Sequence, residues 1–139
     1  MKKLLKIIRN QVKERKINMK TGIIVLGHGS RATEATQVFT EIVDKVREKV
    51  DYDLVKGAAM ELAEPSLQDS VAKIIKAGAE KVVIVPLFLF PGIHIQEDIP
   101  NLIEQLEVEY PKVEFKFGRN LGADDKIADI LAERIEEAE

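Results

Sequence analysis

The fold of this chain is decided by the stretch that reads Val25-Leu26-Gly27-His28-Gly29-Ser30-Arg31. The stretch closes an apolar run that begins at Thr21, and a helical pattern of apolar residues follows it. A continuous apolar run of this length is typical of a parallel strand covered on both faces. We therefore predict a strand, a tight turn that carries His28, and a helix over about 33–50.

Three further strand–helix units follow along the chain. Apolar or alternating runs predict strands at 54–62, 81–85 and 113–117, the last of them at a sheet edge. Ser66 is a good N-cap residue, and Gly78 stands where a helix would end. The alternating order predicts an α/β, flavodoxin-like parallel sheet with strand order 2-1-3-4 and helices on both faces.

The last two helices are predicted from the spacing of their apolar residues. Residues 91–94 read as a loop, and a helix is expected over about 97–109 with Pro100 in its first turn. The final helix is predicted to turn one apolar face toward the body of the protein. That face consists of Ile127, Ile130, Leu131 and Ile135.

Composition excludes several classes of protein. At 139 residues, with 45% apolar and 32% charged residues, the chain has the size and make-up of one globular domain. Because it contains no cysteine, disulfides, iron–sulfur clusters and thiolate metal sites are excluded. No apolar stretch reaches the ~18–20 residues of a membrane span.

Charge divides the chain into a basic N-terminal extension, residues 1–19, and a domain expected over 20–139. Residues 1–20 hold eight of the 21 Lys and Arg but one of the 24 acids, which leaves 13 bases and 23 acids beyond them. An acidic body of this kind argues against nucleic-acid binding. The extension is expected to be helical. Three arrangements are open for it: a packed helix, a loosely held arm, or an added upstream segment. A role at a membrane surface is least favoured.

Polar side chains follow three of the predicted strands. In open α/β sheets, ligands bind beyond the carboxyl ends of the strands, where the strand order reverses. His28 follows the first strand, His94 the third and Glu61 the second. A single histidine is more often a cap, but two at one sheet edge favour a shared site. Imidazole and carboxylate suit Co, Ni, Fe or Zn, and imidazole also accepts protons near neutral pH.

Other glycine-turn motifs fit the first turn less well. It lacks the spacing of a nucleophile elbow and the Gly-Lys-Ser/Thr of a P-loop, and Ala32 replaces the third glycine of a dinucleotide fingerprint. Ser30, Arg31 and the amides at the helix start are still suited to hold a carboxylate. The run 87–90 is either core strand or an apolar wall for a flat ligand.

Three sequence blocks together resemble the class II tetrapyrrole chelatases, and most of all the small, single-half sirohydrochlorin cobaltochelatases. The blocks are Leu26-Gly27-His28-Gly29-Ser30-Arg31, Met60-Glu61-Leu62-Ala63-Glu64-Pro65-Ser66, and Val85-Pro86-Leu87-Phe88-Leu89 with Gly92-Ile93-His94 and Asp98-Ile99-Pro100. The resemblance runs from about Lys20 to the C-terminus. Their order and spacing are specific, whereas each block alone is weak.

The resemblance implies an enzyme that inserts a divalent metal, with Co²⁺ favoured, into sirohydrochlorin in cobalamin biosynthesis. It implies no ATP and no organic cofactor, and it implies a cytoplasmic homodimer without a nucleic-acid or membrane partner. His28 and His94 would bind the metal and accept protons, with Glu61 as the supporting carboxylate. The tetrapyrrole contacts expected on this basis are Ser30, Arg31, Leu89 and Phe90.

Alternatives remain open at this level. Nickel or iron insertion into the same tetrapyrrole would use a closely similar protein. Gln96 and Glu97 stand where some relatives carry another histidine, so the metal preference of those relatives does not carry over to this chain. A non-catalytic carrier of metal or tetrapyrrole would need the same histidines. An interaction domain of the same fold would not use them at all.

Overall fold

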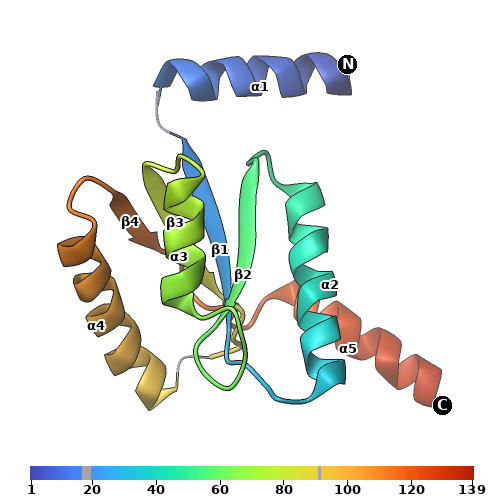
Figure 1. The fold of residues 1–139 in the computed structure, drawn as a ribbon. Coiled ribbons are helices and arrows are strands. Elements are labelled where there is room, and N and C mark those ends of the chain that lie inside the picture. The colour runs from blue at the N-terminus through green and yellow to red at the C-terminus, as the bar shows by residue number, and fades with distance from the viewer. Residues whose placement is uncertain (17–19, 91) are drawn as a thin grey trace.

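The protein is an α/β domain preceded by a separate helix (Figure 1). The computed structural model describes residues 1–16, 20–90 and 92–139, with the side chains of residues 10–16 and 93–95 outside the described set. In chain order the elements are α1 (Lys2–Lys16), β1 (Thr21–Gly27), α2 (Thr33–Lys49), β2 (Leu54–Ala59), α3 (Leu67–Lys76), β3 (Lys81–Pro86), α4 (Ile93–Glu109), β4 (Glu114–Phe117) and α5 (Asp125–Ala138).

The four strands form one parallel sheet in the order β2-β1-β3-β4, which confirms the predicted fold. β1 is buried along almost its whole length, because it lies in the middle of the sheet and has a helical layer on each side. β3 ends at Pro86, whose ring nitrogen has no hydrogen to donate to a ladder. The order reverses between β1 and β3, so both strands lead into the same edge of the sheet.

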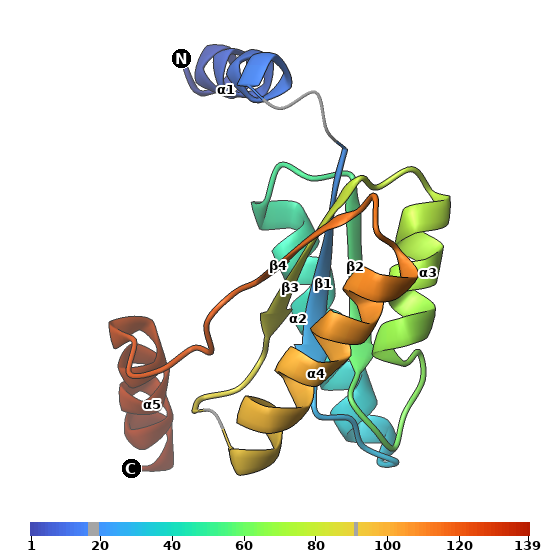
Figure 2. The same ribbon diagram turned by 90° about the vertical axis from the view of Figure 1, so that its left-hand side faces the viewer.

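Helices lie on both faces of the sheet (Figure 2), and an apolar layer holds them on each face. On one face, α3 and α4 pack on a core that includes Ile24, Ile84 and Ile99. On the other face, α2 places Val43 against Val25 and Val55. Both layers bury branched aliphatic side chains, each of which contributes about 1.5–3 kcal/mol when removed from water.

Local sequence signals set the ends of α3. The Ser66 hydroxyl accepts a hydrogen bond from the Asp69 amide at 3.2 Å, as expected of an N-cap. Gly78 follows the helix with φ of +110°, and its amide donates to the Ile75 carbonyl. This left-handed residue ends the helix as the sequence predicts.

Two predicted boundaries are wrong near the expected site. β2 ends at Ala59 rather than near residue 62, because the chain turns away there and Leu62 adopts a positive φ of 63°. α4 begins at Ile93, so His94 lies in the first turn of a helix and not in a loop. Pro100 consequently lies inside α4, beyond its first turn. The helix starts earlier because Gly92, in extended conformation, serves as its N-cap.

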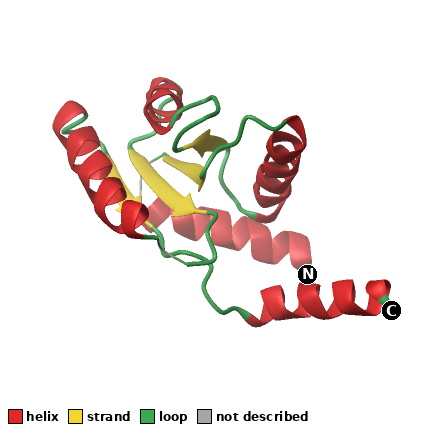
Figure 3. Ribbon diagram, turned by 90° about the horizontal axis from the view of Figure 1, so that it is seen from below, coloured by secondary structure: helices red, strands yellow, loops and turns green. Residues whose placement is uncertain are grey.

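The predicted inward face of α5 is also wrong. Figure 3 shows α5 standing apart from the sheet and its covering helices. Ile130, Leu131 and Ile135 are 50%, 59% and 67% exposed, and none of the described α5 residues is buried. The apolar spacing of this helix is real, but the described part of its own chain does not cover the apolar face.

α1 lies at the end of the sheet opposite to the carboxyl ends of the strands (Figure 1). In the part of α1 whose side chains are described, two ion pairs reach the domain, from Lys6 and Arg9 to Asp51 at 3.6 Å each. Its apolar side chains at Leu4 and Leu5 are more than half exposed, so these two residues do not show the packed helix that was one of the three expected arrangements. Among the described residues, no helix combines the length and the hydropathy of a bilayer span.

Candidate active site

The backbone brings His28 and Glu61 together at the carboxyl end of the sheet. β1 and β2 pair in register up to Gly27 and Ala59, and the same ladder continues past both strands. The Met60 amide donates to the Gly27 carbonyl at 3.0 Å, and the Glu61 amide donates to the His28 carbonyl at 3.1 Å. The two turns therefore stay side by side although their side chains lie near the surface.

Gly29 permits this close approach. Its φ is +100°, a conformation that L-residues with a side chain rarely adopt. A Cβ at this position would lie 1.7 Å from the carbonyl oxygen of Glu61, far inside contact distance. The glycine of the first turn is thus required by the backbone of the second turn, which links two of the sequence blocks physically.

The side chains of His28 and Glu61 also meet. The His28 Nε2 atom lies 3.1 Å from Glu61 Oε1, and the two side chains are 61% and 59% exposed. A carboxylate at this distance favours a proton on the facing nitrogen, Nε2, which leaves the lone pair of the other ring nitrogen available. That free nitrogen can bind a metal ion or take a proton.

Phe88 holds the other side of the histidine. Its ring meets the His28 ring edge-on, with centroids 6.5 Å apart and planes at 78°. The sequence suggested a wall at Leu89 and Phe90, and these two side chains are 51% and 74% exposed. The contact between Phe88 and His28 was not predicted.

An open cleft of about 670 Å³ adjoins the His28–Glu61 pair. On its far side, α4 contributes Asp98, Asn101 and Gln105, spaced by three and four residues along one helix face. These three polar residues were not predicted as site residues. Their helical spacing within the predicted helix was the available signal.

His94 belongs to the same end of α4. The backbone places it in the first turn, one turn before Asp98 and two residues after Gly92, which lines the cleft. Its expected meeting with His28 rests on a side chain outside the described residues. Among the side chains that are described, no cluster of three or more His, Asp or Glu is arranged around a metal position.

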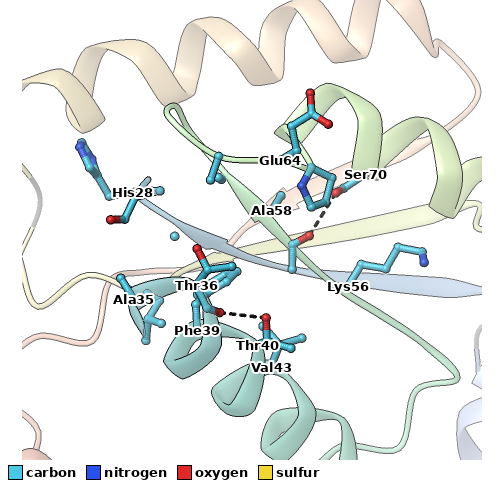
Figure 4. Close-up of a pocket in the computed structure, with 18 of the residues that line it drawn as sticks. His28, Ala35, Thr36, Phe39, Thr40, Val43, Lys56, Ala58, Glu64 and Ser70 are labelled. Atoms are coloured by element: carbon cyan, nitrogen blue, oxygen red, sulfur yellow. Dashed lines mark hydrogen bonds between the residues drawn. The ribbon is translucent and has the colours of Figure 1, made fainter. Parts of the chain in front are cut away.

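A second cavity, of about 430 Å³, runs from His28 along the free edge of β2 between α2 and α3 (Figure 4). Two side chains satisfy the edge carbonyls: Ser70 Oγ donates to Gly57 O at 3.1 Å, and Arg47 Nη2 donates to Val55 O at 2.8 Å. Side chains from α3 and α2 thus satisfy two carbonyl groups on the free edge of β2.

The predicted tetrapyrrole contacts lie in two places. Ser30 lines the second cavity, and its hydroxyl accepts a hydrogen bond from the Ala32 amide at 3.0 Å, whereas Arg31 is exposed. Leu89 lies in the segment that follows β3. Its carbonyl accepts from the Asn120 side chain at 3.0 Å and from the Gly122 amide at 2.8 Å. Asn120, a polar residue at this edge, therefore braces the apolar segment.

Comparison with known proteins agrees with this arrangement. The model of the CbiX family matches residues 22–138, which include both turns, the cleft and α5. This chain belongs to the CbiX family. The match begins after α1, so the basic extension lies outside the part that the family model covers.

Curated relatives of this CbiX-family chain differ in length and in named metal. A sirohydrochlorin cobaltochelatase of Methanococcus maripaludis is 33% identical, over 81% of this chain and 95% of that relative. The chloroplastic sirohydrochlorin ferrochelatase of Arabidopsis thaliana is 38% identical, over 83% of this chain but 51% of that relative. The chain thus spans nearly all of one relative and about half of the other.

Solved structures show the same division. A cobalamin biosynthesis CbiX protein of Marinobacter aquaeolei superimposes with a TM-score of 0.74 at 31% identity, covering 85% of this chain and 96% of that one. The sirohydrochlorin chelatase of Bacillus subtilis subspecies spizizenii, solved in complex with cobalt, gives 0.81 at 28% identity, covering 86% of this chain and 51% of that one. The fold of this CbiX-family chain therefore occurs in proteins of one and of about two such lengths.

Proposed function

We propose that this chain is a metal chelatase that inserts a divalent ion into sirohydrochlorin, with Co²⁺ as the favoured metal. The observation that carries the proposal is the His28–Glu61 pair, 3.1 Å apart beside an open cleft at the point where the strand order reverses. Relatives named sirohydrochlorin cobaltochelatase that match over most of both chains support the substrate and the metal.

The chemistry of the reaction fits the groups at the cleft. Metallation removes two pyrrole protons from the macrocycle and puts one divalent ion in their place, so a site needs both a metal ligand and a base. His28, with Glu61 on one nitrogen, offers the other nitrogen for either task. His94 is proposed as the second histidine, and Asp98, one turn further along α4, as an additional oxygen donor.

The tetrapyrrole has a flat apolar ring and a carboxylate rim. We assign the ring to the exposed Leu89 and Phe90 and the rim to Ser30 and Arg31, which precede the N-terminal amides of α2. One copy of the chain offers these groups to one side of a ligand. A homodimer, with the macrocycle between two copies, is therefore part of the proposal, and the double-length relatives support it.

Iron is the second candidate metal. The Arabidopsis relative, at 38% identity, is named a ferrochelatase, and imidazole with carboxylate binds Fe²⁺ as well as Co²⁺. The sites of the two activities need not differ in the residues described above. The metal must therefore be assigned by measurement with each ion.

The test is a metallation assay on the purified protein. Sirohydrochlorin is mixed with Co²⁺, Fe²⁺ or Ni²⁺, and the change of its absorption bands is followed with and without protein. We expect acceleration by the wild type and a loss of about 10²–10⁴-fold in His28→Ala, the usual contribution of an acid–base group. Lys112→Ala, an exposed change in the loop between α4 and β4, is the control.

Two outcomes would overturn the proposal. If the wild type leaves the spontaneous rate unchanged while binding sirohydrochlorin stoichiometrically, the chain is a carrier rather than an enzyme. If calorimetry shows the same Co²⁺ binding in the wild type and in a His28→Ala/His94→Ala double variant, the histidines are incidental.

A further inference from the structure

α1 is a helix whose apolar side chains remain in water. In the part of α1 whose side chains are described, Leu4, Leu5, Ile7 and Ile8 are 59%, 56%, 53% and 46% exposed. A helix of about 15 residues is only marginally stable by itself, and most helices are stabilised by packing of an apolar face. α1 has 15 residues, so it needs a surface that the described part of its own chain does not supply.

The two sides of α1 differ in chemistry. Successive residues of a helix are about 100° apart around its axis. Leu4, Leu5 and Ile8 therefore lie on one side, which we call the apolar side of α1. Lys6 and Arg9 lie on the other side. A helix with basic residues on one side and leucine on the other is typical of segments that lie in the plane of a membrane interface.

The ion pairs of α1 turn its apolar side away from the domain. The nitrogen atoms of Lys6 and Arg9 each lie 3.6 Å from an oxygen of Asp51. Because these two bases share one side of the helix, Leu4 and Ile8 lie on the side that faces away from Asp51. The Lys6 and Arg9 side chains are 66% and 70% exposed, and exposed ion pairs of this kind contribute little to stability.

Charge selects an anionic partner for α1. The helix holds seven Lys and Arg and the single acid Glu14, whereas the rest of the chain holds 14 bases and 23 acids. Pairing of two α1 helices would bring like charges together. An anionic surface attracts basic segments and repels the acidic remainder of the chain, so contact through α1 is favoured over contact through the domain.

The apolar side narrows the choice among anionic partners. A nucleic acid would neutralise the bases through its phosphates but would leave Leu4 and Ile8 in water. A protein interface relies largely on buried aromatic anchors, and none of the 15 residues of α1 is aromatic. An anionic bilayer meets both sides of the helix, because its headgroups attract the bases and its acyl boundary accepts the apolar side chains.

We infer that α1 binds this chain to the surface of an anionic phospholipid bilayer, with the helix in the plane of the interface and its apolar side buried. The family match begins at residue 22, so it does not cover this helix. A membrane-surface role was the least favoured expectation for residues 1–19, and the exposure of the apolar side reverses that order. The inference goes beyond the proposed reaction and does not depend on it.

Binding through α1 leaves the candidate active site accessible. α1 lies at the end of the sheet where β1 begins (Figure 1). His28 and Glu61 lie at the opposite end, just beyond the ends of β1 and β2. A bilayer on the outer side of α1 is therefore remote from the cleft that adjoins this pair. A membrane-bound copy keeps that cleft open to water.

The first experiment measures binding of the full chain to large vesicles by co-sedimentation. The vesicles consist of phosphatidylcholine alone or of phosphatidylcholine with about 30% phosphatidylglycerol, an anionic lipid. We expect the wild type to bind the mixed vesicles at least about tenfold more tightly. Raising the salt concentration from about 0.1 M to about 0.5 M should remove most of this difference, because salt screens the surface charge. A wild type that does not bind the mixed vesicles, or that binds both kinds equally, would overturn the inference.

Variants then test each side of α1. Leu4→Gln/Ile8→Gln should weaken binding to the mixed vesicles by about tenfold or more, because two apolar side chains no longer enter the interface. Lys2→Gln/Lys3→Gln should weaken it by about 25-fold, at about fivefold per base. The control removes two exposed lysines from α2 and α3, Lys45→Gln/Lys76→Gln, and should bind as the wild type does. Binding that the Leu4→Gln/Ile8→Gln variant retains would contradict insertion of the apolar side.

Three further results would identify a different role for α1, and each would refute bilayer binding. The first is tighter binding to single-stranded RNA than to vesicles, unchanged in Leu4→Gln/Ile8→Gln. The second is a wild type that ignores vesicles but loses mass in sedimentation when Leu4 and Ile8 are changed, which would show that a second copy covers the helix. The third is a lower metallation rate of Leu4→Gln/Ile8→Gln without lipid, which would show that the apolar side supports the domain. Vesicle binding is measured without sirohydrochlorin, so its outcome is independent of the chelatase proposal.

Discussion

Substitution of Gly29 by alanine tests whether the two turns of the site are locked together by their backbones. The new Cβ would lie 1.7 Å from Glu61 O, 2.9 Å from Glu61 C and 3.2 Å from the Ala59 side chain. Since carbon and oxygen do not approach within 3.0 Å without displacement, the Glu61 turn must move by more than 1 Å. That movement breaks the bond from the Glu61 amide to the His28 carbonyl.

The expected losses follow from two terms. A left-handed backbone costs about 1–2 kcal/mol for a residue with a side chain, and a forced displacement of packed atoms costs a further ~1–3 kcal/mol. We therefore expect Gly29→Ala to lower the free energy of unfolding, measured by urea denaturation, by about 2–5 kcal/mol. The metallation rate should fall about 100-fold, since misplacing a catalytic group by 1 Å has an effect of that size.

Gly78→Ala is the matched control for this experiment. Gly78 has φ of +110°, close to the +100° of Gly29, but its Cβ would meet only the flexible Lys20 side chain at 3.5 Å. It should lose about 1–2 kcal/mol of stability and no metallation activity. Equal losses of stability and activity in the two variants would refute the proposed collision with Glu61.

Three further substitutions separate chemistry from folding. Glu61→Gln should slow metallation by about 10–100-fold, because the substitution removes the charge that orients the His28 ring. The midpoint of urea unfolding should stay unchanged. As a control, Glu64→Gln in the same loop should leave the metallation rate unaltered. Asp98→Asn should lower the metallation rate about tenfold at limiting metal concentration, since the loss of an oxygen donor weakens metal binding. The rate should recover at high metal concentration. A loss of rate that added metal does not restore would exclude Asp98 as a metal ligand. Ser70→Ala leaves the Gly57 carbonyl without its donor and should cost about 1–3 kcal/mol in urea unfolding with full activity per folded molecule.

Local chemistry explains what the sequence predicted well. Ser66 and Gly78 act through atoms of their own helix ends, so the limits of α3 could be predicted from these residues alone. β1 could be predicted because a central parallel strand needs apolar side chains on both faces. The alternation of strands and helices predicted a parallel sheet, in which the carboxyl ends of all strands share one edge. His28 and Glu61 were therefore expected at that edge, and their 3.1 Å contact agrees with this.

The errors come from features that depend on distant or external surfaces. Pro100 suggested a helix start nearby, but α4 begins at Ile93, which places His94 in the first helical turn instead of a loop. The face of α5 that includes Leu131 was predicted to pack inward, because periodicity shows that a face is apolar without showing which molecule covers it. Phe88 was missed because its partner, His28, is sixty residues away in sequence.

The ladder that continues from β1 and β2 into the two turns has a consequence for motion. The Glu61 amide is bonded to the His28 carbonyl, directly beyond paired strands of the sheet. Its hydrogen can exchange with solvent only when the end of the sheet opens. Opening of paired strands costs more free energy than opening of a loop, so this exchange should be slow. Slow deuterium uptake at this one amide, in a side-chain environment that is more than half exposed, would show that the histidine and the carboxylate keep their spacing between turnovers.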